Sequence, residues 1–67
     1  MNFEEWLSEA SSYYIKNKDE QRRGQAYWNF LMEKRIDLTN NMLGTRLDPF
    51  YDDRRLEEFL EYVKRNW

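Results

Sequence analysis

The chain has 67 residues, which is one domain at most, and a chain this short buries only about 60% of its unfolded surface. It contains no cysteine and no histidine, so a disulfide and the usual zinc-binding sets are excluded. Aromatic residues make up 18% of the chain, and each buries roughly 150–250 Å². We therefore expect aromatic packing to be the main source of stability.

The charge balance is 11 basic against 13 acidic residues, a net charge of -2. This argues against a dedicated nucleic-acid binder, which is usually basic, and against a mimic of the DNA phosphate charge. No apolar stretch approaches the roughly 20 residues of a membrane span. Residues 1–5 are acidic and lack the apolar run of a signal peptide. We expect a cytoplasmic protein, in keeping with the absence of cysteine.

The first helix is predicted to begin at Asn2, because Asn2 and Glu5 have the spacing of a capping box. Apolar residues follow at helical spacing and form one stripe: Phe3, Trp6, Leu7, Ala10 and Tyr14. Asn17 and Glu20 repeat the capping-box spacing, so the second helix is expected to begin there.

The second helix is predicted to run to residues 34–35. Its inward side is expected to carry Arg23, Ala26, Tyr27, Phe30, Leu31 and Lys34. Gly24 lies in its interior, where glycine costs roughly 1 kcal/mol relative to alanine. We predict that another helix backbone or a bulky ring packs closely against this glycine.

Residues 36–44 are predicted to form a short helix that Asp37 caps and that Gly44 ends in a left-handed conformation. In the following segment, 48–53, Asp48 is expected to act as a cap and Pro49 to occupy the first turn. One helical or 3-10 turn should follow it and bury either Phe50 or Tyr51.

The final helix has the clearest amphipathic pattern, and Asp52 or Asp53 is expected to cap it. Its apolar side consists of Leu56, Phe59, Leu60, Val63 and Trp67. We expect Glu61 to pair with Lys64 or Arg65, and Trp67 to be packed against the bundle. The fold class is therefore all-α, a small bundle of three main helices plus one short helix or 3-10 turn, forming a single domain over residues 1–67.

Catalytic and metal-binding chemistry find little support in the sequence. The acidic group consists of Asp48, Asp52, Asp53 and Glu57. It lacks the alternating ligands and the glycine of a calcium loop, so we interpret these carboxylates as helix caps and first-turn charges. No spacing brings a nucleophile and a base together. We expect no catalytic residue, no metal and no cofactor, and hence no enzyme.

Aromatic residues that fall off the apolar stripes suggest a surface for a partner protein. Trp28 stands out, because burial of the main stripe would leave it partly exposed, and exposed tryptophan and tyrosine are enriched in interface hot spots. The alternative is that the short helix covers Trp28 and makes the second helix central. The residues predicted to contact a partner are Tyr13, Arg22, Arg23, Tyr27 and Trp28.

Two other functions stay open at this point. A basic run near the aromatics could contact nucleic acid through Lys16, Lys18, Arg22 and Arg23. Asp19 and Glu20 interrupt this run, so nucleic acid is the less favoured partner. Self-association into a homo-oligomer is the third alternative.

The second half of the sequence resembles a widespread set of small proteins encoded by tailed bacteriophages and prophages. The segments that carry the resemblance are Gly24-Gln25-Ala26-Tyr27-Trp28-Asn29-Phe30-Leu31, Asp37-Leu38, Gly44-Thr45, Asp48-Pro49-Phe50-Tyr51-Asp52-Asp53, Arg55-Leu56, Phe59-Leu60 and Trp67. The resemblance spans about two thirds of the chain and excludes the first seventeen residues; related proteins often have proline where this chain has Ile36. It implies a phage gene product in the host cytoplasm that binds or inhibits a host or phage protein, and it implies no activity or cofactor.

Overall fold

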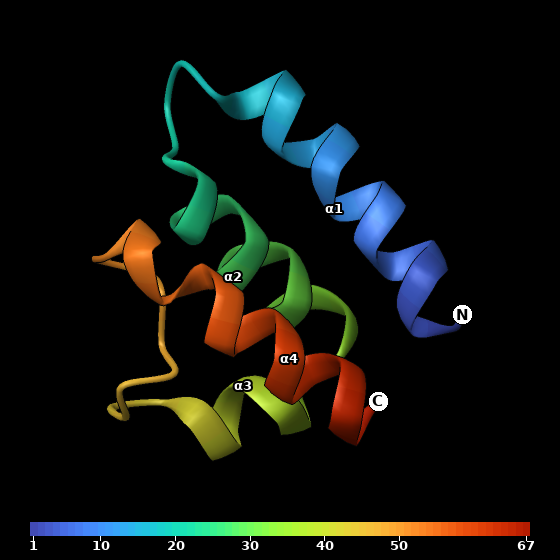
Figure 1. The fold of residues 1–67 in the computed structure, drawn as a ribbon. Helices are drawn as coiled ribbons and strands as arrows, with labels where there is room; N and C mark the ends of the chain where they lie inside the picture. The colour runs from blue at the N-terminus through green and yellow to red at the C-terminus, as the bar shows by residue number, and fades with distance from the viewer.

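The computed structural model describes all 67 residues, and the chain is all-α (Figure 1). Its elements in chain order are α1 (Phe3–Asn17), α2 (Arg23–Lys34), α3 (Ile36–Met42), the 3-10 turn η1 (Asp53–Arg55) and α4 (Leu56–Asn66). This confirms the predicted small bundle of three main helices. Both of the short elements that the sequence offered as alternatives are present, a short helix (α3) and a 3-10 turn (η1) that leads directly into α4.

The second helix, α2, lies at the centre of the bundle and packs against α1, α3 and η1 (Figure 1). Trp28 on α2 meets Phe59 of α4, with ring centroids 6.1 Å apart. On another side of α2, Tyr27 meets Trp6 of α1 edge-on at 6.3 Å. Because α2 is covered on two sides, its interior residues are Gly24, Ala26, Tyr27, Trp28 and Leu31.

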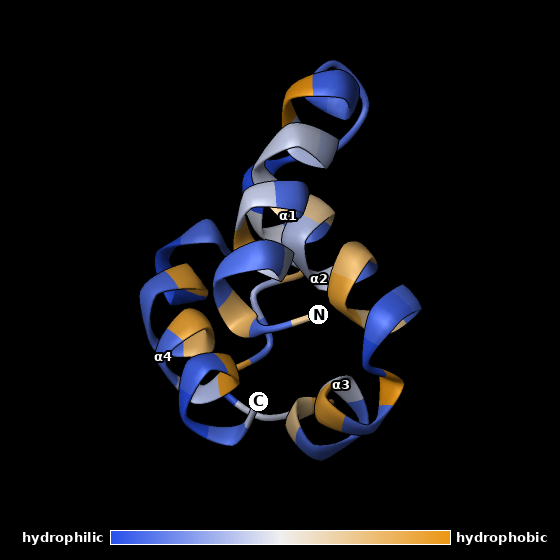
Figure 2. Cartoon of the chain, turned by 90° about the vertical axis from the view of Figure 1, so that its right-hand side faces the viewer, coloured by the Kyte–Doolittle hydropathy of each residue, from blue (hydrophilic) through white to orange (hydrophobic).

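Trp6 joins three helices in the core. It is fully buried, and the rings of Phe3, Tyr27, Phe59 and Trp67 lie within 5.9 to 6.4 Å of its ring. Its indole N–H has no hydrogen-bond partner, which costs about 1–3 kcal/mol. Burial of a ring of roughly 150–250 Å² at about 25 cal/mol per Å² outweighs that cost. Trp67, whose ring meets that of Trp6, is packed against the bundle as predicted. Figure 2 shows that the apolar residues of α4 lie on the side of this helix that faces the other helices.

The capping box at the start of α1 is confirmed, but the predicted start of α2 is wrong. The Glu5 N–H donates to Asn2 Oδ1 at 2.8 Å, and the Asn2 N–H donates to Glu5 Oε1 at 3.0 Å. Asn17 belongs to the last turn of α1, where its Nδ2 donates back to the Tyr13 carbonyl at 2.8 Å. Its side chain therefore does not cap forward to Glu20, and α2 begins only at Arg23.

The predicted close packing at Gly24 is confirmed. The neighbour, however, is the turn at Pro49 and not a helix backbone or a ring. A Cβ added at Gly24 would overlap the Pro49 carbonyl oxygen and lie 2.8 Å from Asp53 Oδ1. The Gly24 N–H donates to Asp53 Oδ1 at 2.9 Å. The side chain of Arg22, the residue before α2, forms no capping bond. Asp53, distant in the sequence, instead accepts an N–H in the first turn of α2.

The turn that reaches Gly24 is held by its own hydrogen bonds. The Phe50 N–H donates to Asp48 Oδ1 at 2.9 Å, and the Asp52 N–H donates to the Pro49 carbonyl at 3.1 Å. Pro49 is fully buried and Phe50 is half-buried, whereas Tyr51 is exposed. The predicted turn after Pro49 is thus present, and of its two aromatics Phe50 is the one that packs inward.

The ends of α3 and the start of α4 test the predicted caps. Gly44 has a φ of 79°, which confirms the left-handed end of α3. Asp37 does not cap α3; it forms a two-bond ion pair with Arg35, whose Nη1 also donates to the Trp67 carbonyl at 2.8 Å. Neither Asp52 nor Asp53 caps α4 itself, which has no side-chain cap. Asp52 caps η1 by accepting from the Arg54 N–H at 3.0 Å, and Asp53 serves α2.

The close approach at Gly24 predicts a stability change opposite to helix propensity. Gly24→Ala in an open helix would stabilise the protein by about 1 kcal/mol. Here we expect a loss of about 2 kcal/mol or more, because the new methyl group has no space beside Pro49. Urea unfolding measures this change in the free energy of unfolding. The control is Ser8→Ala, at an exposed position of α1, which should stabilise the protein slightly. A Gly24→Ala protein as stable as the native one would contradict the packing.

Candidate functional site

The residues predicted to contact a partner do not form one surface. Trp28 and Tyr27 are only 5% and 6% exposed. Trp28 does not stay partly exposed, because α4 covers it through Phe59. The alternative, a central second helix buried on two sides, is confirmed. Tyr27 is turned towards α1, where its hydroxyl forms a 2.7 Å hydrogen bond with the Ser11 hydroxyl. Both aromatic rings are core residues and are not available to another molecule in this fold.

Tyr13 lies at the edge of the bundle and is half-buried. Its ring lies 5.3 Å from that of Phe30, and its hydroxyl donates to Gln21 Oε1 at 3.3 Å. Together with Lys16 it borders an open hollow of about 300 Å³. Tyr13 is therefore the one predicted aromatic contact with accessible surface.

The two arginines of the predicted surface are exposed but have structural contacts. Arg22 donates from Nη2 to the Phe50 carbonyl and from Nη1 to Asp53 Oδ1 at 3.4 Å. The guanidinium of Arg23 lies over the ring of Tyr14, 5.2 Å from its centroid. The basic run is thus divided, because Arg22 faces the turn at residues 48–52 and Arg23 covers α1.

Tyr51 is the most exposed large apolar side chain, with 86% of its surface accessible. Its ring meets Phe50 edge-on with centroids 4.8 Å apart. The turn beneath it is fixed by the buried Pro49 and by the Arg22 bond to the Phe50 carbonyl. The sequence predicted a turn here that buries one of the two aromatics, yet it did not indicate which of them would face outward.

The charges beside Tyr51 are arranged asymmetrically. The side chain of Arg54 is 91% exposed, whereas that of its partner Asp52 is 26% exposed. Asp52 accepts three hydrogen bonds from Arg54, one from its N–H and two from its guanidinium. These bonds lower the pKa of Asp52 to about 2, so its carboxylate stays charged and held at neutral pH. Asp52 is thus held by both the backbone N–H and the guanidinium of Arg54, and the Arg54 side chain extends into solvent around this pair.

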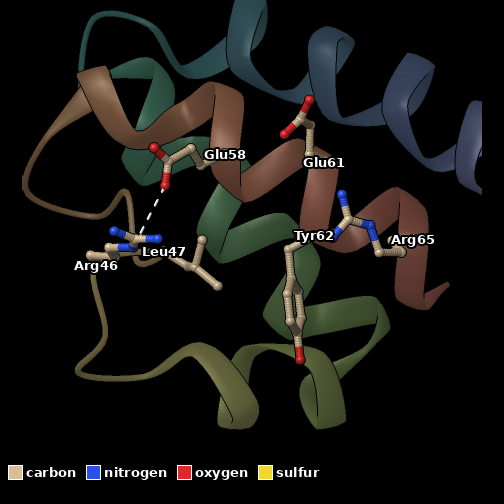
Figure 3. A pocket seen from close by; sticks show the side chains of 6 residues that line it. All are labelled: Arg46, Leu47, Glu58, Glu61, Tyr62 and Arg65. Atoms are coloured by element: carbon tan, nitrogen blue, oxygen red, sulfur yellow. Dashed lines mark ion pairs between the residues drawn. The ribbon is translucent and has the colours of Figure 1, made fainter.

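The other hollows are open and lined mainly by charged side chains. Figure 3 shows one of about 350 Å³ between the loop at residues 46–47 and α4, crossed by an ion pair of Arg46 with Glu58 at 3.8 Å. Its remaining side chains belong to α4: Glu61, Tyr62 and Arg65. The predicted pairing of Glu61 with Lys64 or Arg65 is not formed, since the structure has no ion pair at Glu61. A second hollow, of about 480 Å³, is bordered by Tyr51, Arg55 and the carboxylates of Asp48 and Asp52.

Comparison of the chain with protein-family models, with curated proteins and with solved structures finds no match. The structure has no group of three or more acidic side chains placed to hold a metal ion. None of its helices has both the length and the apolar character needed to span a membrane. The turn that presents the exposed Tyr51 is the candidate functional site.

The burial of Trp28 predicts a structural role that a substitution can measure. Trp28→Ala removes a ring that packs on Phe59 and should cost about 3–5 kcal/mol, lowering the melting temperature by more than about 10 °C. Tyr51→Ala serves as the matched control and should change the melting temperature little, because its ring is exposed. Thermal unfolding followed by circular dichroism compares the two. Equal melting temperatures for Trp28→Ala and the native protein would contradict the packing at Trp28.

The low pKa of Asp52 predicts a defined acid response. Because the folded pKa lies below the ordinary value of 3.8, the Asp52 carboxylate stabilises the fold above about pH 4 and loses this effect as the pH falls towards 2. A carboxyl NMR titration should give a midpoint of about 2 in the native chain and a higher midpoint in Arg54→Gln. A native midpoint near 3.8 would show that the Asp52–Arg54 bonds do not form in solution.

Proposed function

We propose that this chain is a small, non-enzymatic accessory protein of phage type that binds a protein of the host or of the phage in the host cytoplasm. The observation that carries the proposal is Tyr51, an aromatic ring that is 86% exposed on a turn fixed by Pro49 and Arg22. Burial of such a ring in a partner gains apolar contact, and little ordering cost opposes it because the turn is already rigid.

The binding surface differs from the aromatic helical surface that the sequence suggested. Trp28 and Tyr27 belong to the core, so the surface moves to the turn at residues 48–52. Arg22 remains part of it, because its guanidinium holds the Phe50 carbonyl at the base of that turn. Tyr13 lies apart from this corner, beside Phe30.

One observation favours self-association as the second candidate. Three large aliphatic side chains are exposed along the end of α2 and along α3: Met32, Ile36 and Leu43. Ile36 is the first residue of α3, and Leu43 directly follows the last residue of this helix. The nucleic-acid alternative gains less support, because Arg22 and Arg23 are already engaged within the fold.

Affinity capture tests the proposal directly. The tagged full-length chain is incubated with bacterial lysate, with and without phage infection, and Tyr51→Ala, which keeps the fold, serves as the matched control. We expect at least one protein that the native chain retains and that nuclease treatment does not release. Retention of nucleic acid alone, or of nothing beyond the control, would overturn the proposal. Sedimentation of the purified chain at two concentrations separates a heterologous partner from a second copy.

A further inference from the structure

The exposed ring of Tyr51 lies beside the largest hollow of the protein surface. This hollow of about 480 Å³ is bordered by Gly44, Thr45, Asp48, Tyr51, Asp52 and Arg55. It is open to solvent and has room for an aromatic side chain. The turn therefore combines a protruding ring, 86% exposed, with an adjacent recess.

The polar groups of this hollow comprise a free acceptor and free donors. Asp48 accepts from the Phe50 N–H with Oδ1 at 2.9 Å, which leaves its Oδ2 free. Arg55 approaches Asp52 only through Nε, at 3.9 Å, which leaves its two terminal nitrogens without an ion pair. Asp52 itself is engaged, because both of its oxygens bind Arg54. The hollow thus offers one acidic and one basic group to another molecule.

The charges of the corner around Tyr51 are balanced, so they favour neither an acidic nor a basic partner. Its three carboxylates equal its three guanidinium groups in number: Asp48, Asp52 and Asp53 against Arg22, Arg54 and Arg55. A surface that carries both a protrusion and a recess, and both a free acid and a free base, is complementary to itself under a two-fold axis. Such self-complementarity is what contact between two copies of one chain requires.

We infer that two copies of this chain form a weak symmetric dimer, in which the Tyr51 ring of each copy enters the hollow beside Tyr51 of the other. The ring gains apolar contact when it leaves water. The two-fold axis brings Asp48 of one copy to Arg55 of the other, and symmetry repeats this pair.

The area of the corner limits the strength of this dimer. A tyrosine ring buries about 150–250 Å², and the recess that receives it loses a comparable area, whereas a stable interface buries about 800 Å² per partner. The corner supplies less than that. We therefore expect a dissociation constant on the order of 100 µM.

A dimer of this kind controls access to Tyr51, a consequence that rests on the proposed function. The ring cannot occupy a second copy and another protein at the same time. At concentrations well below the dissociation constant of the dimer the ring is free, and at higher concentrations it is covered. A protein partner thus competes with the second copy for the same ring.

Sedimentation equilibrium of the purified full-length chain, between about 10 µM and about 1 mM, measures the dimer. We expect Tyr51→Ala to weaken dimerisation about tenfold or more, and Ile15→Ser, at an exposed position of α1, to leave it unchanged. Ile36→Ser tests the exposed aliphatic side chains as the alternative contact and should also leave it unchanged. A strict monomer at about 1 mM, or a dimer that Ile36→Ser weakens and Tyr51→Ala does not, would overturn the inference.

Isotope-filtered NMR on an equal mixture of labelled and unlabelled chains locates the contact. We expect nuclear Overhauser contacts between the Tyr51 ring of one copy and the Thr45 methyl group of the other. Asp48→Asn, which keeps Oδ1 for the Phe50 N–H, should weaken the dimer about threefold, because exposed ion pairs contribute little. A populated dimer without the contact between Tyr51 and Thr45 would contradict the arrangement.

The two proposals can fail separately. A strict monomer that still retains a protein from bacterial lysate would overturn the dimer and leave the proposed function standing. A dimer that depends on Tyr51, in a chain that retains no other protein, would overturn the proposed function and leave the dimer standing.

Discussion

The contact between the turn at residues 48–53 and the first turn of α2 is the constraint on which the rest of this fold depends. Pro49 lies against Gly24 so closely that no side chain fits there, and Asp53 accepts the Gly24 N–H. Arg22 closes the same contact by binding the Phe50 carbonyl. Because η1 and α4 follow directly, this contact fixes where α4 begins and thus allows Phe59 to cover Trp28.

The same contact connects the fold to its proposed function. It uses one oxygen each of Asp48 and Asp53 for backbone hydrogen bonds, while Asp52 binds the N–H and the guanidinium of Arg54. It also divides two adjacent aromatics, with Phe50 packed inward and Tyr51 in solvent. A small domain can therefore present one exposed aromatic ring on a fixed turn, which is a suitable surface for contact with another protein.

Features set by short-range chemistry were predictable from the sequence, whereas features set by distant contacts were not. The capping box at Asn2, the left-handed Gly44 and the amphipathic α4 depend on residues within a few positions of one another. The exposed Tyr51 and the cap of α2 depend on which segments meet in space, whereas the late start of α2 follows from a local choice of Asn17, which bonds back to Tyr13. Asp53 was one of two candidate caps for the final helix, and nothing local indicates that it instead accepts from an N–H 29 residues earlier in α2.

Hydrogen exchange at the Gly24 amide tests this central contact most directly. This N–H lies in the first turn of α2, where no intrahelical acceptor exists, so only Asp53 can protect it. Native-state exchange followed by NMR should show Gly24 protected as strongly as the buried amides of α2, with protection lost in Asp53→Ala. Exchange of Gly24 at the rate of an unstructured peptide in the native chain would show that the turn does not dock on α2.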